Sequence, residues 1–346
     1  MSEPTPPSPP APENERPQEV WIITPPRQRW WLYVLFFVLT MFSTLVVGAR
    51  MQDHYLHDQP AFSLDENIFA PFVTWIGHPS ELLPGLPFSL TLMFILFAHE
   101  MGHYLYARYY RVYATPPFFL PFPSLIGTLG AFIRIKSPIP SRAALFDIGI
   151  AGPIAGFIPA CVAVLAGLSL SHPLVSSSGA PDNELGFPLV FHLAARILHT
   201  GAPLSSLSLH PIAVAGWVGM FATSLNLLPG GQLDGGHILF SVLPRLHRWI
   251  SFLTVLALIP LMKYCWMGWL LWAVVLWLTS HHPPVPAHPG VSGARKWVAV
   301  FGVAMLVLAF TPAPFSEASG RDVWRQGGQP AVQWLGEKIR HSLHKN

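Results

Sequence analysis

Residues 86–110, LPFSLTLMFILFAHEMGHYLYARYY, decide how this chain is built. The first half of the stretch is an apolar run, and the second half carries His99, Glu100 and His103 in the pattern H-E-x-x-H. On a helix, positions i and i+4 stand on the same face about one turn apart. His99 and His103 can therefore both direct a ring nitrogen at one metal ion, with Glu100 beside them.

This pattern is typical of a zinc-dependent hydrolase, in which the glutamate acts on a water held by the ion. Its setting is unusual, because ionisable groups within an apolar span are costly to insert and mark functional sites. The alternative is a pair of interfacial histidines with a glutamate that extends to the headgroups. A catalytic zinc needs a third protein ligand and one open position, so a further ligand is expected elsewhere in the chain.

The composition indicates a membrane protein. Of the 346 residues, 51% are hydrophobic and 11% are charged, and the mean hydropathy is +0.43, whereas soluble domains carry about 25% charged residues. We predict an all-α polytopic membrane protein with six or seven transmembrane helices. The net charge of +3 comes without a basic run interleaved with aromatics, so no nucleic-acid partner is expected. Cys161 and Cys265 are isolated and are expected to pack in the core.

Apolar runs and basic loops predict the topology. The first run, 30–49, is long enough to span a bilayer; a signal peptide is not excluded there, but the long tail ahead of it favours an anchor. Basic residues gather before this run and in loop 108–147, so the N-terminus and the site are predicted on the cytoplasmic side of the cell membrane. Residues 250–279 form one broken span or two short ones, which leaves the side of the C-terminus open.

The sequence predicts three regions along the chain. Residues 1–29 are predicted to be a disordered proline-rich cytoplasmic tail, because nine prolines and several acids cannot form a packed core. Residues 30–312 form the transmembrane domain, with the motifs concentrated in 86–240. Residues 313–346 are a C-terminal tail.

Asp234 is the candidate third ligand. The charge rule sends the second and fourth apolar runs across the membrane in the same direction, so Asp234 lies at the depth of His99 and His103. A carboxylate oxygen binds zinc beside two imidazole nitrogens. Asp234 could instead cap a helix, and Asp147 and Glu184 are alternative acids, although Glu184 is predicted on the far side of the membrane. A proline-rich loop also offers imidazoles, which could bind metal or be solvated: His281, His282 and His288.

These motifs carry a resemblance to a known family. H-E-x-x-H in a span, followed by Asn226-x-x-Pro229 and by Leu-Asp-Gly-Gly at 233–236, resembles the site-2 protease family of intramembrane zinc metalloproteases. The segments GTLGAF at 127–132 and DIGIAGPIAG at 147–156 resemble the branch without a PDZ domain, which includes plastid-type members.

The resemblance implies one Zn²⁺ per chain with His99, His103 and Asp234 as ligands. It also implies that Glu100 is the catalytic residue and that Asn226 lies near the scissile carbonyl. The alternative role for Asn226 is a polar contact between helices.

The resemblance further implies hydrolysis of a peptide bond within or near a transmembrane segment of another membrane protein, such as a membrane-anchored transcription regulator or anti-sigma factor. Membrane lipid is the expected surrounding. Residues 125–135 look strand-forming, and they could be a re-entrant strand that pairs with an unwound substrate or a hairpin that only packs. Two further readings are a membrane zinc protease of soluble or loop peptides and a metal-binding transporter or scaffold.

Overall fold

The computed structural model describes residues 29–62, 79–174 and 185–315. Within them, three helical segments are long and apolar enough to cross a membrane, at Trp30–Leu56, Ser80–Tyr109 and Arg142–Leu170. The first is helix α1, Trp30–Leu56. The second consists of the 3-10 helix η1, Pro79–Gly85, and helix α3, Leu86–Tyr109. The third is helix α4, Arg142–Leu170.

The other described helices are shorter: α5 Leu189–Leu198, α6 Pro211–Asn226, α7 Asp234–Val242, α8 His247–Tyr264, α9 Trp269–Leu278 and α10 Arg295–Ala309. Helix α6 is about 24 Å long at 1.5 Å per residue, less than the hydrocarbon core of about 30 Å. The prediction of six or seven spans is therefore not confirmed. Residues 250–279 were predicted to form either one broken span or two short ones. They contain two helical segments, the greater part of α8 and all of α9.

Helix α4 is continuous through two prolines. The apolar stretch 148–170 contains Gly152-Pro153 and Pro159, which favour a break, but the helix is unbroken from Arg142 to Leu170. Its start is fixed by Ser141, whose Oγ accepts a hydrogen bond from the amide of Ala144 at 3.1 Å and so satisfies one free amide of the first turn.

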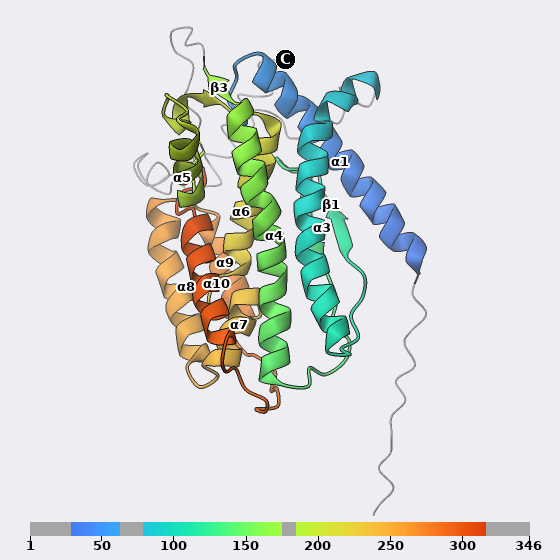
Figure 1. Cartoon of the computed structure of the whole chain (residues 1–346), viewed down its shortest axis with the longest axis vertical. Coiled ribbons are helices and arrows are strands. Elements are labelled where there is room, and N and C mark those ends of the chain that lie inside the picture. Colours follow the sequence, from blue (N-terminus) through green and yellow to red (C-terminus); the bar gives the residue numbers. More distant parts are fainter. Residues whose placement is uncertain (1–28, 63–78, 175–184, 316–346) are drawn as a thin grey trace, which may run out of the picture.

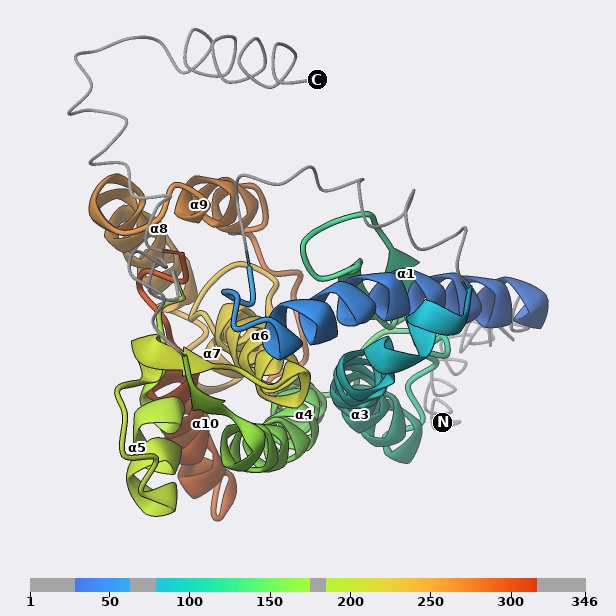
Figure 2. The same ribbon diagram turned by 90° about the horizontal axis from the view of Figure 1, so that it is seen from above.

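Helices α3, α4 and α6 form the centre of the molecule. Each packs against the other two, and α1 crosses the outer side of α3, as both ribbon views show (Figures 1 and 2). The core between them contains fully buried large side chains, including Phe88, Leu92, Phe146 and Trp217. Their burial holds the middle of α3 between two neighbours, so the face carrying His99 and His103 looks into the protein.

The predicted strand segment is confirmed in its central part. Strands β1, Phe118–Pro121, and β2, Thr128–Phe132, form an antiparallel hairpin in which Phe118 pairs with Phe132. The hairpin packs against α1, and the Ser43 hydroxyl donates a 2.6 Å hydrogen bond to the Gly127 carbonyl. A second pair of very short strands joins β3, His172–Pro173, to β4, Leu207–Ser208, next to the 3-10 helix η2, Leu204–Ser206.

The predicted tails lie largely outside the described residues, so the boundaries at 29–30 and 312–313 stay predictions. Glu184, one of the alternative acids, also lies outside them.

Candidate metal centre

Helix α3 carries both histidines on its inner face. The side chains of His99, Glu100 and His103 are all buried, with 6–7% of each residue exposed. The helix is pressed against α4 at this level, because a side chain at Gly102 would overlap the carbonyl of Ala151. The imidazoles therefore occupy a fixed position between two helices.

Asp234 reaches the same place from the other side. The chain leaves α6 at Asn226, turns, and begins the separate helix α7 at Asp234, so Asp234 does not lie on the fourth apolar run itself. Leu233, not Asp234, is the capping position of α7. A side chain at Gly235 would overlap the carbonyl of Leu227. The glycine lets the start of α7 fold tightly under the end of α6, which brings Asp234 to the histidines.

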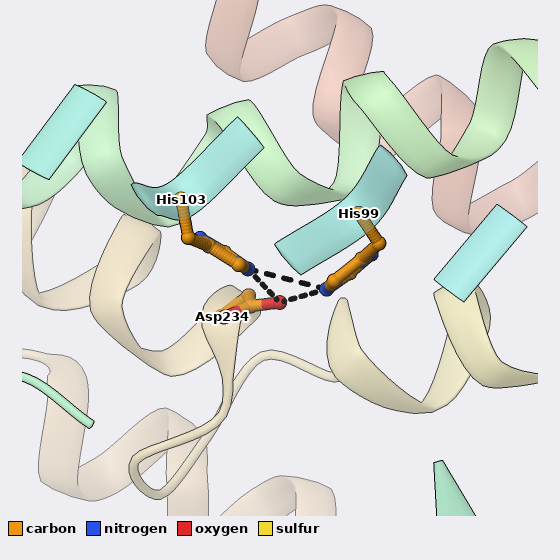
Figure 3. Close-up of side chains that lie close together, drawn as sticks. All are labelled: His99, His103 and Asp234. Carbon is orange, nitrogen blue, oxygen red and sulfur yellow. Dashed lines mark hydrogen bonds and ion pairs between the residues drawn. The ribbon is translucent and has the colours of Figure 1, made fainter. Parts of the chain in front are cut away.

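The three side chains form a nearly equilateral triangle of ligand atoms (Figure 3). The Oδ2 atom of Asp234 lies 3.3 Å from the Nε2 atoms of His99 and His103, and the two Nε2 atoms are 3.2 Å apart. Ligands at 2.0–2.2 Å from a tetrahedral zinc are separated by about 3.3–3.6 Å. The observed triangle fits that geometry, and these are the three residues among those described that form a group able to hold a metal ion.

The neighbouring helix α4 orients the imidazole of His103. Its Nδ1 lies 2.7 Å from the carbonyl oxygen of Ile148, and since a carbonyl can only accept, Nδ1 carries the proton. The neutral ring then presents the Nε2 lone pair to the centre of the triangle. Such a hydrogen bond behind a metal-binding histidine fixes both its tautomer and its direction.

Two glycines of α4 leave space for the rings. A methyl group at Gly152 would overlap the ring of His103, and one at Gly156 would lie 3.1 Å from Nδ1 of His99. Neither glycine was predicted as a site residue, although a Gly-x-x-x-Gly spacing within an apolar run signals close helix contact.

The other two predicted site residues lie at the rim of the triangle. Glu100 lines the same cavity as Ile133, just after β2. The side-chain nitrogen of Asn226 lies 3.3 Å from Nε2 of His99. The structure therefore brings all five predicted site residues together.

Asp147 is excluded as the third ligand because it is committed elsewhere. It accepts hydrogen bonds from Nε of Arg295 at 2.8 Å, from Nη2 of Arg295 at 2.7 Å and from the hydroxyl of Tyr110. Hydrogen bonding to Asp147 raises the pKa of the Arg295 guanidinium. This cluster ties the start of α10 to α3 and α4.

The triangle opens into a cavity of about 770 Å³. One wall is formed by the end of β2 and the segment after it. Another is formed by residues 282–286, part of the segment 280–294 between α9 and α10 that is here called the strap. The strap is held by hydrogen bonds from the amide of Arg142 to Pro286 and from the amide of Ala143 to Pro289, both 3.1 Å. Part of the cavity wall thus comes from a segment distant in sequence from the metal-binding motifs.

His282 of the strap contacts a histidine that was not assigned from the sequence. Nδ1 of His282 donates to the carbonyl of Pro283 at 2.7 Å, so in the neutral ring Nε2 is an acceptor. It lies 2.8 Å from Nδ1 of His237, which must be the donor. Burial lowers the pKa of His237 to about 4, so this ring is neutral and its Nε2 is an acceptor. One sequence feature points to His237. It follows Asp234 by three residues, and residues three apart lie on the same face of a helix.

A family comparison decides what kind of domain surrounds this centre. The model of Peptidase family M50 matches residues 87–265, more than half of the chain. The chain belongs to Peptidase family M50. This is the site-2 protease family, so the resemblance seen in the sequence is confirmed. The M50 match covers α3 through α8 and includes every residue of the triangle.

Curated relatives agree with this assignment. The chain is 29% identical over 301 residues to "Probable zinc metalloprotease EGY1, chloroplastic" of Oryza sativa subsp. japonica, covering 82% of this chain and 51% of that protein. It is 27% identical over 311 residues to the Arabidopsis thaliana protein of the same name, covering 85% and 55%. The chain thus spans about half the length of the curated relatives it matches. Family and relatives identify the matched part as a zinc metalloprotease domain, for which Zn²⁺ is the expected metal.

Proposed function

We propose that this M50 chain is an intramembrane zinc endopeptidase that hydrolyses a peptide bond within or near a transmembrane segment of another membrane protein. The donor triangle of His99, His103 and Asp234 carries the proposal. His99 and His103 lie on a helix long and apolar enough to span a membrane, Asp234 reaches them from the start of α7, and the distances among the three suit a single zinc. We infer that these three residues are the ligands.

The chemistry divides among few residues. When bound, zinc supplies a Lewis acid that activates water and polarises the carbonyl of the scissile bond. Glu100 takes the proton of the attacking water and delivers it to the leaving amine. The amide of Asn226 donates a hydrogen bond to the carbonyl oxygen as negative charge develops there. One such donor contributes about 3 kcal/mol to transition-state stabilisation.

The hairpin offers a way to hold an unwound substrate. A helical segment must become extended before its peptide bonds can be cut, and its exposed amides then need partners. Strand β2 pairs with β1 on one edge, and Ala131, Phe132 and Ile133 line the cavity. We infer that the substrate adds as a strand along β2, since this edge leads to Glu100.

The proposed partner is a single-span membrane protein, such as a membrane-anchored transcription regulator or anti-sigma factor. The cell membrane as location and the cytoplasmic orientation of the site belong to the same proposal. Variants of Asp234 and Glu100 distinguish this proposal from its alternatives. Zinc retention in Asp234→Ala would indicate a protease of a different type, and activity that does not depend on Glu100 would indicate a metal-binding transporter or scaffold.

The experiment uses the purified full chain with labelled single-span proteins in liposomes and with soluble casein. We expect cuts within or near the apolar segment, mapped by mass spectrometry, and about one zinc per chain. Glu100→Gln should retain zinc and lose cleavage, whereas Asp234→Ala should lose both. Cleavage of casein alone would support the alternative protease, and full activity of Glu100→Gln would contradict the assigned base.

A further inference from the structure

A second cavity, of about 670 Å³, shares the strap with the catalytic cavity. Val285 lines both cavities. The second cavity lies where α4 begins, α7 ends and α8 begins. Its apolar wall includes Phe240, Leu243 and Leu246. It is large enough for a small ligand, since ligand sites commonly measure about 300–1,000 Å³.

Two arginines give this apolar cavity a positive charge. Arg142 and Arg245 both line it. Arg142 is half-buried, and its Nε donates a 3.2 Å hydrogen bond to the carbonyl of Ala287 in the strap. Among the described residues, no carboxylate lines this cavity and neither arginine forms an ion pair. The charge is therefore available to an anionic ligand.

The surroundings favour a lipid over a soluble anion. Leu246, at the cavity wall, is followed along α8 by Trp249, Leu253 and Leu256, which are spaced for one helix face. All four are exposed, Trp249 at 69%. Exposed tryptophan is typical of the membrane–water interface. This apolar stripe leads away from the arginines along the helix, as acyl chains leave a headgroup.

We propose that this cavity binds the phosphate of an anionic phospholipid between Arg142 and Arg245, with the acyl chains along the exposed stripe of α8. Guanidinium groups suit phosphate oxygens because they donate paired hydrogen bonds, and basic pockets between membrane helices bind anionic headgroups. The bound lipid contacts the strap at Val285 and Ala287, so it stabilises one wall of the catalytic cavity. The site does not depend on the proposed protease reaction.

The test measures lipid binding to the full zinc-loaded chain in a neutral detergent. Native mass spectrometry with phosphatidylglycerol and phosphatidylcholine gives the occupancy of each lipid. We expect one tightly held phosphatidylglycerol per chain and much weaker binding of phosphatidylcholine. The variant Arg142→Gln/Arg245→Gln should bind phosphatidylglycerol about 30-fold more weakly, which corresponds to about 1 kcal/mol per arginine.

The matched control is Arg108→Gln/Arg248→Gln, which removes the same charge from residues that do not line the cavity. It should retain wild-type affinity. Because Arg142 also holds the strap, the exposed Arg245→Gln is tested alone, with zinc content as the check of folding, and should weaken binding about fivefold. Equal losses in the two double variants, equal binding of both lipids, or full displacement by millimolar inorganic phosphate would each overturn the proposal.

Discussion

The packing of α4 against the histidines predicts a graded series of glycine substitutions. In Gly152→Ala, the new Cβ would lie 2.5 Å from Cε1 of His103 and closer still to Nε2, whereas ordinary contacts begin near 3.4 Å. Because Nε2 is closer than Cε1, the ring must withdraw by more than about 0.9 Å. Metal sites tolerate deviations of about 0.2 Å in ligand distance, so His103 can no longer serve as a ligand. We expect zinc content to fall from about one per chain to below about 0.1.

Gly156→Ala tests the same wall at His99. Its Cβ would lie 3.0 Å from Cβ of His99 and 3.1 Å from Nδ1, which requires a shift of a few tenths of an ångström. Zinc affinity should fall about 10- to 100-fold, the usual effect of disturbing a residue that supports a ligand. Gly302→Ala on α10 is the control, because its Cβ would meet only the end of the flexible Ile150 side chain, at 3.0 Å.

The assay is zinc content by atomic emission after dialysis against a calibrated chelator, together with cleavage of the liposome reporter. Alanine is favoured over glycine in a helix by about 1 kcal/mol, so the helical circular dichroism of all three variants should match that of the wild type. The expected order of zinc loss is Gly152→Ala, then Gly156→Ala, then Gly302→Ala. Stoichiometric zinc and full activity in Gly152→Ala would refute the placement of His103 against α4.

Three other predictions follow from the same structure. Arg295→Gln removes the paired hydrogen bonds to Asp147 and should destabilise the protein by about 1–3 kcal/mol, seen as a lower midpoint of thermal unfolding with zinc content unchanged; an unchanged midpoint would show that the cluster does not hold α10. Removal of zinc with 1,10-phenanthroline should abolish cleavage and lower the same midpoint, because a ligand of the folded state stabilises it; added zinc should restore both, and Asp234→Ala should show neither response. His282→Leu leaves Nδ1 of His237, a residue of the catalytic cavity wall, without its acceptor and should reduce cleavage about tenfold at full zinc occupancy, the equivalent of one lost hydrogen bond; wild-type cleavage would show that this hydrogen bond does not contribute to the reaction.

The sequence by itself predicted the candidate ligands and indicated the character of the chain. The spacing of His99 and His103 is a local property, because four residues make about one helical turn whatever surrounds them. Composition and hydropathy indicated membrane helices for a similar reason, since each span is a property of consecutive residues. The charge rule placed Asp234 at the depth of the two histidines but left Asp147 as an alternative acid, and the glycine motif around Asp234 added the family resemblance.

Only the tertiary structure decided what surrounds these candidate ligands. The carbonyl of Ile148 behind His103, the glycines that make room for the rings and the strap that brings His282 to His237 all join residues far apart in the chain. Such contacts depend on how helices pack, and hydrophobic periodicity does not specify which residue of one helix meets which residue of another. For the same reason, the sequence could not show that Asp147 pairs with Arg295 and is thereby unavailable to a metal ion.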